Sequence, residues 1–224
     1  RIDDLYHASV NGRGKFLAAS NPEEFTTGLR AALAAIVERT GSFSNVAANS
    51  TRVDAGTQLF QASYVSGVWT GELKAYAVST TGVAATATWN ASAGIPATGR
   101  QIFTFDGTSG ATFPTAAQMA ALDRPGPTAA DLPVVTGADN AAYIAGTRTL
   151  ELANGGALRN RNHLLGDIVS SSPAYDPATG TIYVGANDGM LHAFRADDGK
   201  ELFAYIPRAV ATQLNKLTHP SYVH

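Results

Sequence analysis

One six-residue pattern occurs twice in the chain and restricts its fold more than any other feature. Residues 71–76 (GELKAY) and 189–194 (GMLHAF) both read Gly-x-Leu-x-Ala-aromatic. Side chains alternate between the two faces of a strand, so each copy predicts a strand with two different faces. In the strand 190–195, which contains most of the second copy, one face carries Leu191, Ala193 and Arg195. The other face carries Met190, His192 and Phe194.

Short turns flank the second copy of the pattern. Residues 187–189 (NDG) and 197–199 (DDG) separate three apolar runs at 181–185, 190–195 and 201–206. Asp-Gly pairs supply the positive φ that two-residue hairpin turns need, so this part of the chain predicts a tight antiparallel meander.

A repeated meander is typical of β-propeller blades, which take roughly 40–50 residues each and come in sets of at least about four. The 224 residues have room for about two blades. The predicted fold class is therefore mainly β: a partial β-propeller of antiparallel meander blades, with an N-terminal helix and an irregular, partly helical insertion.

The remaining elements follow from local signals. A helix begins at Asn21 and Pro22 and ends near Gly41. Further strands are predicted at 58–66, 72–79, 86–91 and 101–105, and another opens at Ile168 and stops near Pro173. Proline-rich residues 108–161 break the strand pattern, with short helices predicted at 116–122 and 138–145.

These elements divide the chain into four parts. Residues 1–57 form an N-terminal segment whose helix packs on the propeller, and residues 58–106 form the first blade-like meander. Residues 107–161 form an irregular insertion, and residues 162–224 form the second blade-like meander with a C-terminal tail. The chain starts abruptly at Arg1, and we expect it to continue in the full protein.

Composition excludes several classes of function. Sixteen basic and eighteen acidic residues give a net charge of -2, which provides no strong field for nucleic acid or an anionic membrane. The chain has no cysteine, which excludes disulfides, thiolate catalysis and Cys-ligated zinc. No apolar run approaches the roughly 20 residues of a membrane span. We therefore expect neither nucleic acid binding nor membrane insertion.

Few residues suggest catalysis or metal binding. The basic run at 159–163 (RNRNH) could bind an anion, but its side chains could equally bond loop carbonyls, which we favour. The turns 187–189 and 197–199 offer only part of a calcium loop and are better explained as hairpin turns. We assign no catalytic, cofactor or metal residue.

Longer segments resemble known families. Residues 185–203 (GANDGMLHAFRADDGKELF) resemble the repeat of quinoprotein-type eight-bladed propellers, with Phe203 and Asp198 where that repeat has Trp and Thr. Residues 159–173 (RNRNHLLGDIVSSSP) resemble the hallmark of the PilY-type family of type IV pilus assembly proteins and tip adhesins. Residues 3–14, 68–73 and 205–210 are also similar to that family. The motif and structural residues of the resemblance are Trp69, Gly71, Leu73, Arg161, Gly166, Asp167, Ser172, Pro173, Gly185, Asn187, Asp188, Gly189 and Gly199.

The PilY-type resemblance implies a secreted, non-enzymatic protein at the pilus tip or cell surface, which crosses the periplasm and outer membrane in transit. It implies partners among the minor pilins, contact with a host or abiotic surface, and roles in pilus assembly, adhesion and twitching motility. The family's calcium loop is not present, so we expect no cofactor in this chain and Ca²⁺ only in downstream blades of the full-length protein. Residues 108–154 are the candidate partner surface, or else they only cover the open side of an incomplete ring.

Two alternatives remain open. The chain could be a fragment of a quinoprotein dehydrogenase that uses pyrroloquinoline quinone, with Asp167 and Asp188 as the only candidates for its catalytic aspartate. It could also be a purely structural scaffold without a partner of its own.

Overall fold

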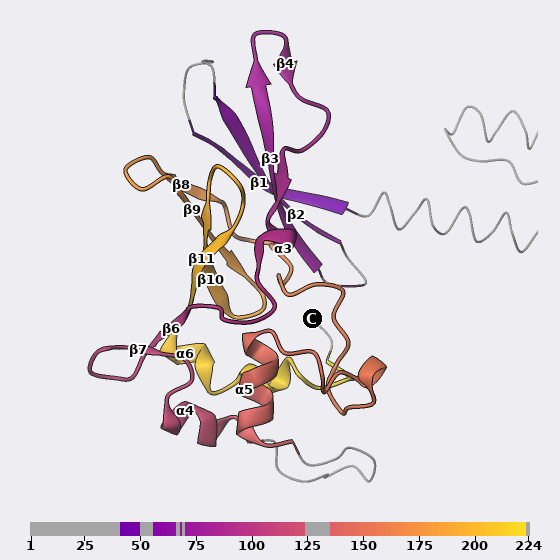
Figure 1. Ribbon diagram of the computed structural model, residues 1–224, viewed down its shortest axis with the longest axis vertical. Coiled ribbons are helices and arrows are strands. Elements are labelled where there is room, and N and C mark those ends of the chain that lie inside the picture. Colours follow the sequence, from indigo (N-terminus) through magenta and orange to yellow (C-terminus); the bar gives the residue numbers. More distant parts are fainter. Residues whose placement is uncertain (1–40, 50–55, 66–67, 69, 124–134, 223–224) are drawn as a thin grey trace, which may run out of the picture. The chain divides into compact units, whose positions relative to one another are not determined.

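The computed structural model describes residues 41–49, 56–65, 68, 70–123 and 135–222, and Figure 1 shows their arrangement. Residues 42–224 belong to one compact unit. The helix expected from Asn21 and the side chain of Trp69 lie outside the described residues. Among the described residues, no helix combines the length and the apolar character that crossing a membrane would require.

The first sheet contains the first copy of the six-residue pattern. Its strands are β1 (Gly41–Ala48), β2 (Gln58–Val65), β3 (Thr70–Ser79) and β4 (Gly82–Val83) in that order, and β5 (Trp89–Asn90) also pairs with β3. The predicted strands at 58–66 and 72–79 are thus confirmed as β2 and β3. The strand expected at 86–91 is reduced to β5, followed by the short helix α3 (Ala91–Gly94).

The second sheet contains the second copy of the pattern, in the strand order β7-β6-β11-β10-β9-β8. Strands β9 to β11 form the predicted antiparallel meander, β8 extends it by pairing with β9, and β6 runs parallel to β11. The bounds are β6 (Ile102–Phe105), β7 (Gly110–Thr112), β8 (Ala174–Asp176), β9 (Thr181–Ala186), β10 (Met190–Arg195) and β11 (Glu201–Ile206). The two turns of the meander carry Gly189 and Gly199 at φ 87° and 70°, which confirms the hairpin-turn interpretation.

The strand predicted from Ile168 to Pro173 is wrong. The chain is irregular there, and the strand begins only at Ala174. Side chains replace the backbone ladder in this stretch: Ser171 Oγ accepts the Gly185 N–H at 2.9 Å, and Asn187 Nδ2 donates to Asp167 Oδ2 at 2.7 Å. Pro173 has no N–H to donate, so regular pairing starts after it.

Both predicted short helices are confirmed. Helix α4 (Ala116–Ala121) begins with a capping box between Thr115 and Gln118, and α5 (Gly137–Ala145) begins with one between Thr136 and Asp139. Each box satisfies backbone N–H groups that a helix start leaves without partners. The C-terminal tail adds α6 (Arg208–Ala211) and a 3₁₀ turn at Leu214–Lys216, and another 3₁₀ turn lies at Leu152–Asn154.

Two buried clusters organise this unit. One lies between the sheets and joins the first sheet to β9, β10 and the loop before β8: Phe60, Ala62, Leu73, Ala75, Ala91, Ile95, Leu165, Ile168, Ile182, Val184, Phe194 and Ala196. The other joins β6, β10 and β11 to the helices drawn below them in Figure 1: Ile102, Phe113, Leu122, Val135, Ala141, Tyr143, Ile144, Leu158, Met190, Ala204, Ile206, Ala211 and Leu214. The described parts of residues 107–161 therefore share a core with the second sheet, while the four part boundaries given above remain a prediction.

One tryptophan connects the two sheets directly. Trp89 stacks on Phe60 with 5.9 Å between ring centroids, and its Nε1 donates to the Ala196 carbonyl at 2.8 Å. A Cβ at Gly199 would overlap the Trp89 ring, so the turn between β10 and β11 can receive this ring only because it carries glycine.

Candidate functional site

The loop 159–167, which carries the most specific sequence motif, lines a cavity of about 50 Å³ between the second sheet and α5. The turn between β9 and β10 closes part of the cavity with Asn187 and Asp188, and α5 contributes Tyr143 and Ile144. A space of this size holds a few water molecules, since one water needs roughly 10–15 Å³ on this scale. The motif therefore lies where the loop, the β9–β10 turn and α5 meet, and it encloses only a small cavity.

Arg161 is held by structural contacts. Its guanidinium lies over the Tyr143 ring at 3.5 Å, and its Nε donates to Glu151 Oε1 at 2.9 Å. Its two terminal nitrogens donate to the carbonyls of Tyr143 and Thr147 at 2.7 and 2.8 Å. Burial lowers the pKa of Arg161 and raises that of the Tyr143 hydroxyl. These contacts use the donors that an anion would need, which confirms the interpretation that the basic run bonds loop carbonyls.

Other members of the run behave in the same way. Arg159 donates from Nε to the Leu217 carbonyl at 3.0 Å, and Asn160 accepts the Ala153 N–H at 2.8 Å. His163 differs, because its buried Nδ1 has no hydrogen-bond partner among the described residues. Burial lowers the pKa of His163, which favours the neutral ring.

Two motif glycines allow the sheets to meet closely. Thr70 forms an isolated antiparallel bridge with Gly166, and the Gly71 N–H points to the Leu165 carbonyl at 3.5 Å. A Cβ at Gly71 would overlap the carbonyl oxygen of Gly166. Gly71 and Gly166 lie in two separate motifs of the sequence, and the structure brings them into contact.

The motif aspartates are occupied by partners that the sequence did not reveal. Asp167, 1% exposed, accepts from Asn187 Nδ2 and its carbonyl accepts the Asn187 N–H at 2.9 Å. Asp188 Oδ2 accepts the Gly166 N–H at 3.0 Å and lies 3.0 Å from Nε2 of His192. These partners come from other turns and strands, which the local sequence pattern does not indicate.

A buried ionic cluster continues from Asp188 into the second sheet. His192 is fully buried and lies between Asp188 and Glu201, with 2.8 Å from its Nδ1 to Glu201 Oε1. Arg100 clamps the same carboxylate through Nε and Nη2, both at 2.7 Å. We refer to Arg100, Asp188, His192 and Glu201 as the buried ionic cluster.

Electrostatics keeps this cluster charged. Burial lowers the pKa of His192, but the carboxylates of Asp188 and Glu201 outweigh burial and raise that pKa to about 9. Burial raises the pKa of both carboxyls, but His192 and their other hydrogen-bond donors hold each pKa below its usual range. The sequence places His192 on one face of a strand, but it does not indicate Arg100 and Glu201 as members of the same cluster. The signal available was a histidine on the buried face of a strand four residues after an aspartate.

The remaining motif residues have structural positions. Leu73 is fully buried between the sheets, Pro173 is buried, and Ser172 is exposed at the surface. Gly185 donates to Ser171, and Asp198 pairs with Arg195 at 2.7 Å beside Gly199. Within the described part of the chain, no group of three or more His, Asp or Glu side chains is arranged to hold a metal ion.

Comparison with known proteins supplies a family. No family model matches the chain, and no solved structure matches it significantly. The "Type IV pilus biogenesis factor PilY1 homolog" of Xylella fastidiosa strain Temecula1 is 34% identical in an alignment that covers 96% of this chain and 20% of the relative. The "Type IV pilus biogenesis factor PilY1" of Pseudomonas aeruginosa is 32% identical in strain UCBPP-PA14 and 34% in strain PAK, each covering 99% of this chain and 23% of the relative.

The similarity thus runs along nearly the whole chain. The chain spans only about a fifth to a quarter of the length of these relatives. Over that region, the chain belongs to the PilY1 family of type IV pilus biogenesis factors.

Proposed function

We propose that this chain is a module of a type IV pilus biogenesis protein, which supports pilus assembly through contacts with minor pilins. The observation that carries the proposal is the similarity to factors named for pilus biogenesis over 96–99% of the chain. We further propose that the protein is secreted and acts at the pilus tip or cell surface, in adhesion to a host or abiotic surface and in twitching motility.

In this proposal the module works by binding and not by catalysis. Asp167 and Asp188, the two candidates for a catalytic aspartate, are engaged in bonds that hold turns together. Asp167 is 1% exposed, so its carboxylate is not directed at an accessible substrate, and Asp188 is paired with the buried His192. A rigid scaffold with exposed loops is better suited to recognition.

The partner surface proposed lies within residues 108–154. Leu150 and Leu152 are 37% and 49% exposed, and the residue between them, Glu151, is 1% exposed. Glu151 pairs with Arg148 at 3.1 Å and with Arg161 at 2.9 Å, and Leu158 exchanges backbone hydrogen bonds with Leu150 and Leu152 at 2.8 Å. The ion pairs of the buried Glu151 and the backbone hydrogen bonds of Leu158 therefore hold the loop in place, while Leu150 and Leu152 are exposed to solvent. Preorganisation of this kind lowers the entropic cost of binding.

Interferometry with purified minor pilins from the same organism tests the proposal at physiological salt. We expect saturable binding of the 224-residue chain, and at least a tenfold weaker affinity for the double variant Leu150→Glu/Leu152→Glu. Val83→Glu is the matched control, because Val83 is 53% exposed on β4 of the other sheet. A folded wild-type chain that does not bind any minor pilin would contradict the assignment of pilin contact to this module. Equal binding by the double variant would move the contact to another surface.

A further inference from the structure

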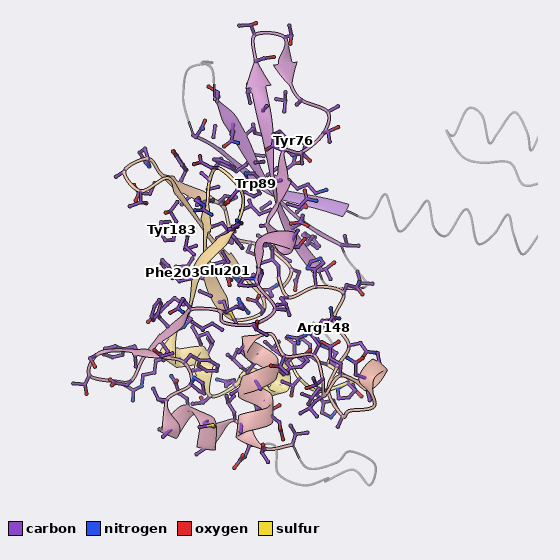
Figure 2. All side chains as sticks on the ribbon, in the orientation of Figure 1. Tyr76, Trp89, Arg148, Tyr183, Glu201 and Phe203 are labelled. Atoms are coloured by element: carbon purple, nitrogen blue, oxygen red, sulfur yellow. The ribbon has the colours of Figure 1, made fainter. Side chains whose placement is uncertain are left out.

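The segment 205–210, which resembles the PilY-type family, contributes to an open cleft that the site described above does not include. The cleft has a volume of about 550 Å³ and lies between the β6–β7 hairpin, the start of α4 and α6, at the lower left of Figure 1. Figure 2 shows the side chains of these elements, drawn below the labelled Phe203. Ligand sites in proteins span roughly 300–1,000 Å³, so the cleft has room for a short peptide segment.

Arg208 is the cation of this cleft. Its guanidinium lies against the hairpin turn, since a Cβ at Gly107 would come within 3.0 Å of its Nη1 and 3.1 Å of its Cζ. In the described part of the chain, the Arg208 side chain donates no hydrogen bond and forms no ion pair. It differs in this from Arg100, Arg148 and Arg161, which each donate to a glutamate. The planar fork of N–H donors on Arg208 is therefore free for a ligand.

The rest of the lining is either apolar or bonded within the chain. Gln118 Oε1 accepts the Thr115 N–H at 3.0 Å, and Thr115 Oγ1 accepts the Gln118 N–H at 3.2 Å. The apolar part of the cleft comes from Phe105, which is 36% exposed, together with Ala117 and Ala209. The cleft thus combines one free guanidinium with an apolar wall.

One carboxylate also lines the cleft and limits which anion fits. Asp106 accepts the N–H groups of Ser109 and Thr108 at 2.8 and 2.6 Å, and these bonds hold the pKa of Asp106 below its usual range. Asp106 therefore stays charged at neutral pH and is bonded to its own turn. Its negative charge opposes a doubly charged phosphate more strongly than a singly charged carboxylate.

We propose that this cleft binds a peptide carboxylate, with Arg208 as its bidentate partner and Phe105 as the wall for an adjacent apolar side chain. An arginine fork forms two parallel N–H···O bonds with a carboxylate, which gives such a pair both strength and orientation. The carboxylate belongs either to a C-terminal residue or to an acidic side chain of the bound peptide. This inference does not depend on the minor-pilin contact at Leu150 and Leu152, which lie outside the lining of the cleft.

NMR titration of the isotope-labelled 224-residue chain with three capped dipeptides tests the proposal. Acetyl-Gly-Phe with a free C-terminus carries a terminal carboxylate, acetyl-Glu-Phe-amide carries a side-chain carboxylate, and acetyl-Gly-Phe-amide carries no charge. We expect saturable shifts of the Arg208 Nε–H and Gly107 N–H resonances with an acidic peptide, and binding of the neutral amide weaker by about tenfold or more. The acid that binds more tightly identifies the source of the carboxylate. Equal binding of all three peptides, or binding of none, would overturn the proposal.

Variants assign the contact to Arg208. Arg208→Gln should weaken binding of the acidic peptide by about tenfold or more, and Arg208→Lys should restore only part of it, because an ammonium group lacks the planar fork. Arg208 is exposed, so both variants should keep the amide spectrum of the folded chain. Lys216→Gln is the matched control, since it removes the same charge from the same C-terminal tail but does not line the cleft. An equal loss in Lys216→Gln would assign the effect to general electrostatic attraction and overturn the site.

Two further measurements define the selectivity and the accessibility of the cleft. Inorganic phosphate at the same concentration should not displace the acidic peptide, because Asp106 opposes a second negative charge. Displacement by phosphate would show a general anion site and overturn the assignment to a carboxylate. The natural gene product that contains this sequence should bind the acidic peptide with similar affinity. Binding by the 224-residue chain alone would show that the rest of the polypeptide covers the cleft, which would also overturn the proposal.

Discussion

The two sheets contain the same six-residue pattern, yet they bury opposite faces of it. In the first sheet Leu73 and Ala75 are buried, and the other face pairs polar residues such as Gln61 with Lys74. In the second sheet His192 and Phe194 are fully buried, and on the other face Leu191 is 39% exposed, although the small side chain of Ala193 is also buried. The difference teaches that the pattern defines a strand and its turns, whereas the neighbouring sheet decides which face is covered.

The polar contacts of the two sheets differ as well. The buried face of the second sheet contains the buried ionic cluster, while the contact face of the first sheet contributes apolar residues to the junction. Buried charges must be paired to be tolerated, so the second sheet depends on its partners more strongly than the first. The predictions below use this difference.

The largest effect is expected at the buried ionic cluster. Glu201→Ala leaves Arg100 and His192 without their shared carboxylate, and loss of one partner of a buried pair costs about 3–5 kcal/mol. Urea unfolding of the 224-residue chain measures the free energy of unfolding. Lys200→Ala is the neighbouring control, because its side chain is 66% exposed, and it should give no measurable change. A Glu201→Ala loss as small as the control's would show that the cluster does not stabilise the second sheet.

The next effect compares the equivalent leucines. Leu73→Ala should cost about 2–5 kcal/mol, because it opens a cavity between the sheets. Leu191→Ala in the 224-residue chain should cost less than about 1 kcal/mol, because that side chain keeps much of its contact with water. The same unfolding measurement checks both. Equal losses of unfolding free energy for Leu73→Ala and Leu191→Ala would mean that both leucines are equally buried in this chain. That result would contradict the difference between the two sheets.

The free energy of unfolding should depend on pH between 6.5 and 9.5 through His192 of the second sheet. The pKa of His192 rises from 6.5 in the unfolded chain to about 9 in the folded one. A raised pKa stabilises the fold fully below pH 6.5, and this contribution is lost as the pH rises through 9. The total is on the order of 3 kcal/mol, at about 1.4 kcal/mol for each pKa unit. Unfolding free energies between pH 6.5 and 9.5 should therefore decline, and His192→Gln should remove the decline. A decline that persists in His192→Gln would assign it to other groups.

The smallest effect is expected at the exposed turn between β10 and β11. Asp198 pairs with Arg195 at 2.7 Å and accepts the Lys200 N–H at 3.1 Å, so its carboxylate stabilises the turn. Asp198→Asn should shift Tm by less than about 2 °C, because exposed ion pairs contribute little. Calcium or a chelator should leave Tm of the 224-residue chain unchanged. A calcium-dependent rise in Tm that Asp198→Asn removes would show that the turn is a calcium loop.

Much of the fold followed from local signals in the sequence. The meander β9–β11 was predicted because its apolar runs and Asp-Gly turns are short-range features, and α4 and α5 were predicted as short helices in the proline-broken segment 108–161; their capping boxes are findings of the structure. The two connected copies of the pattern also indicated a pair of blade-like sheets. Strands β1, β4 and β7 were missed, and a strand was placed from Ile168 to Pro173 where the structure has one only at Ala174–Asp176. In that stretch side-chain bonds from Ser171 and Asp167 replace the backbone ladder, and no local pattern reveals this.

The candidate site was only partly predictable. Gly71, Gly166 and Asp188 were identified through a family motif, but their mutual contact depends on pairing between residues almost a hundred positions apart. Arg100 pairs with Glu201 across 101 positions, which neither periodicity nor spacing can indicate. Long-range pairs of this kind become visible only once the sheets are placed against each other.

The most direct test of the comparison between the two sheets is hydroxyl-radical footprinting of the 224-residue chain, read out by mass spectrometry at the two equivalent leucines. We expect Leu191 to be oxidised at least fivefold more than Leu73, because Leu191 is 39% exposed and Leu73 is fully buried. Equal oxidation of the two leucines would contradict the account that the sheets use this face of the pattern differently.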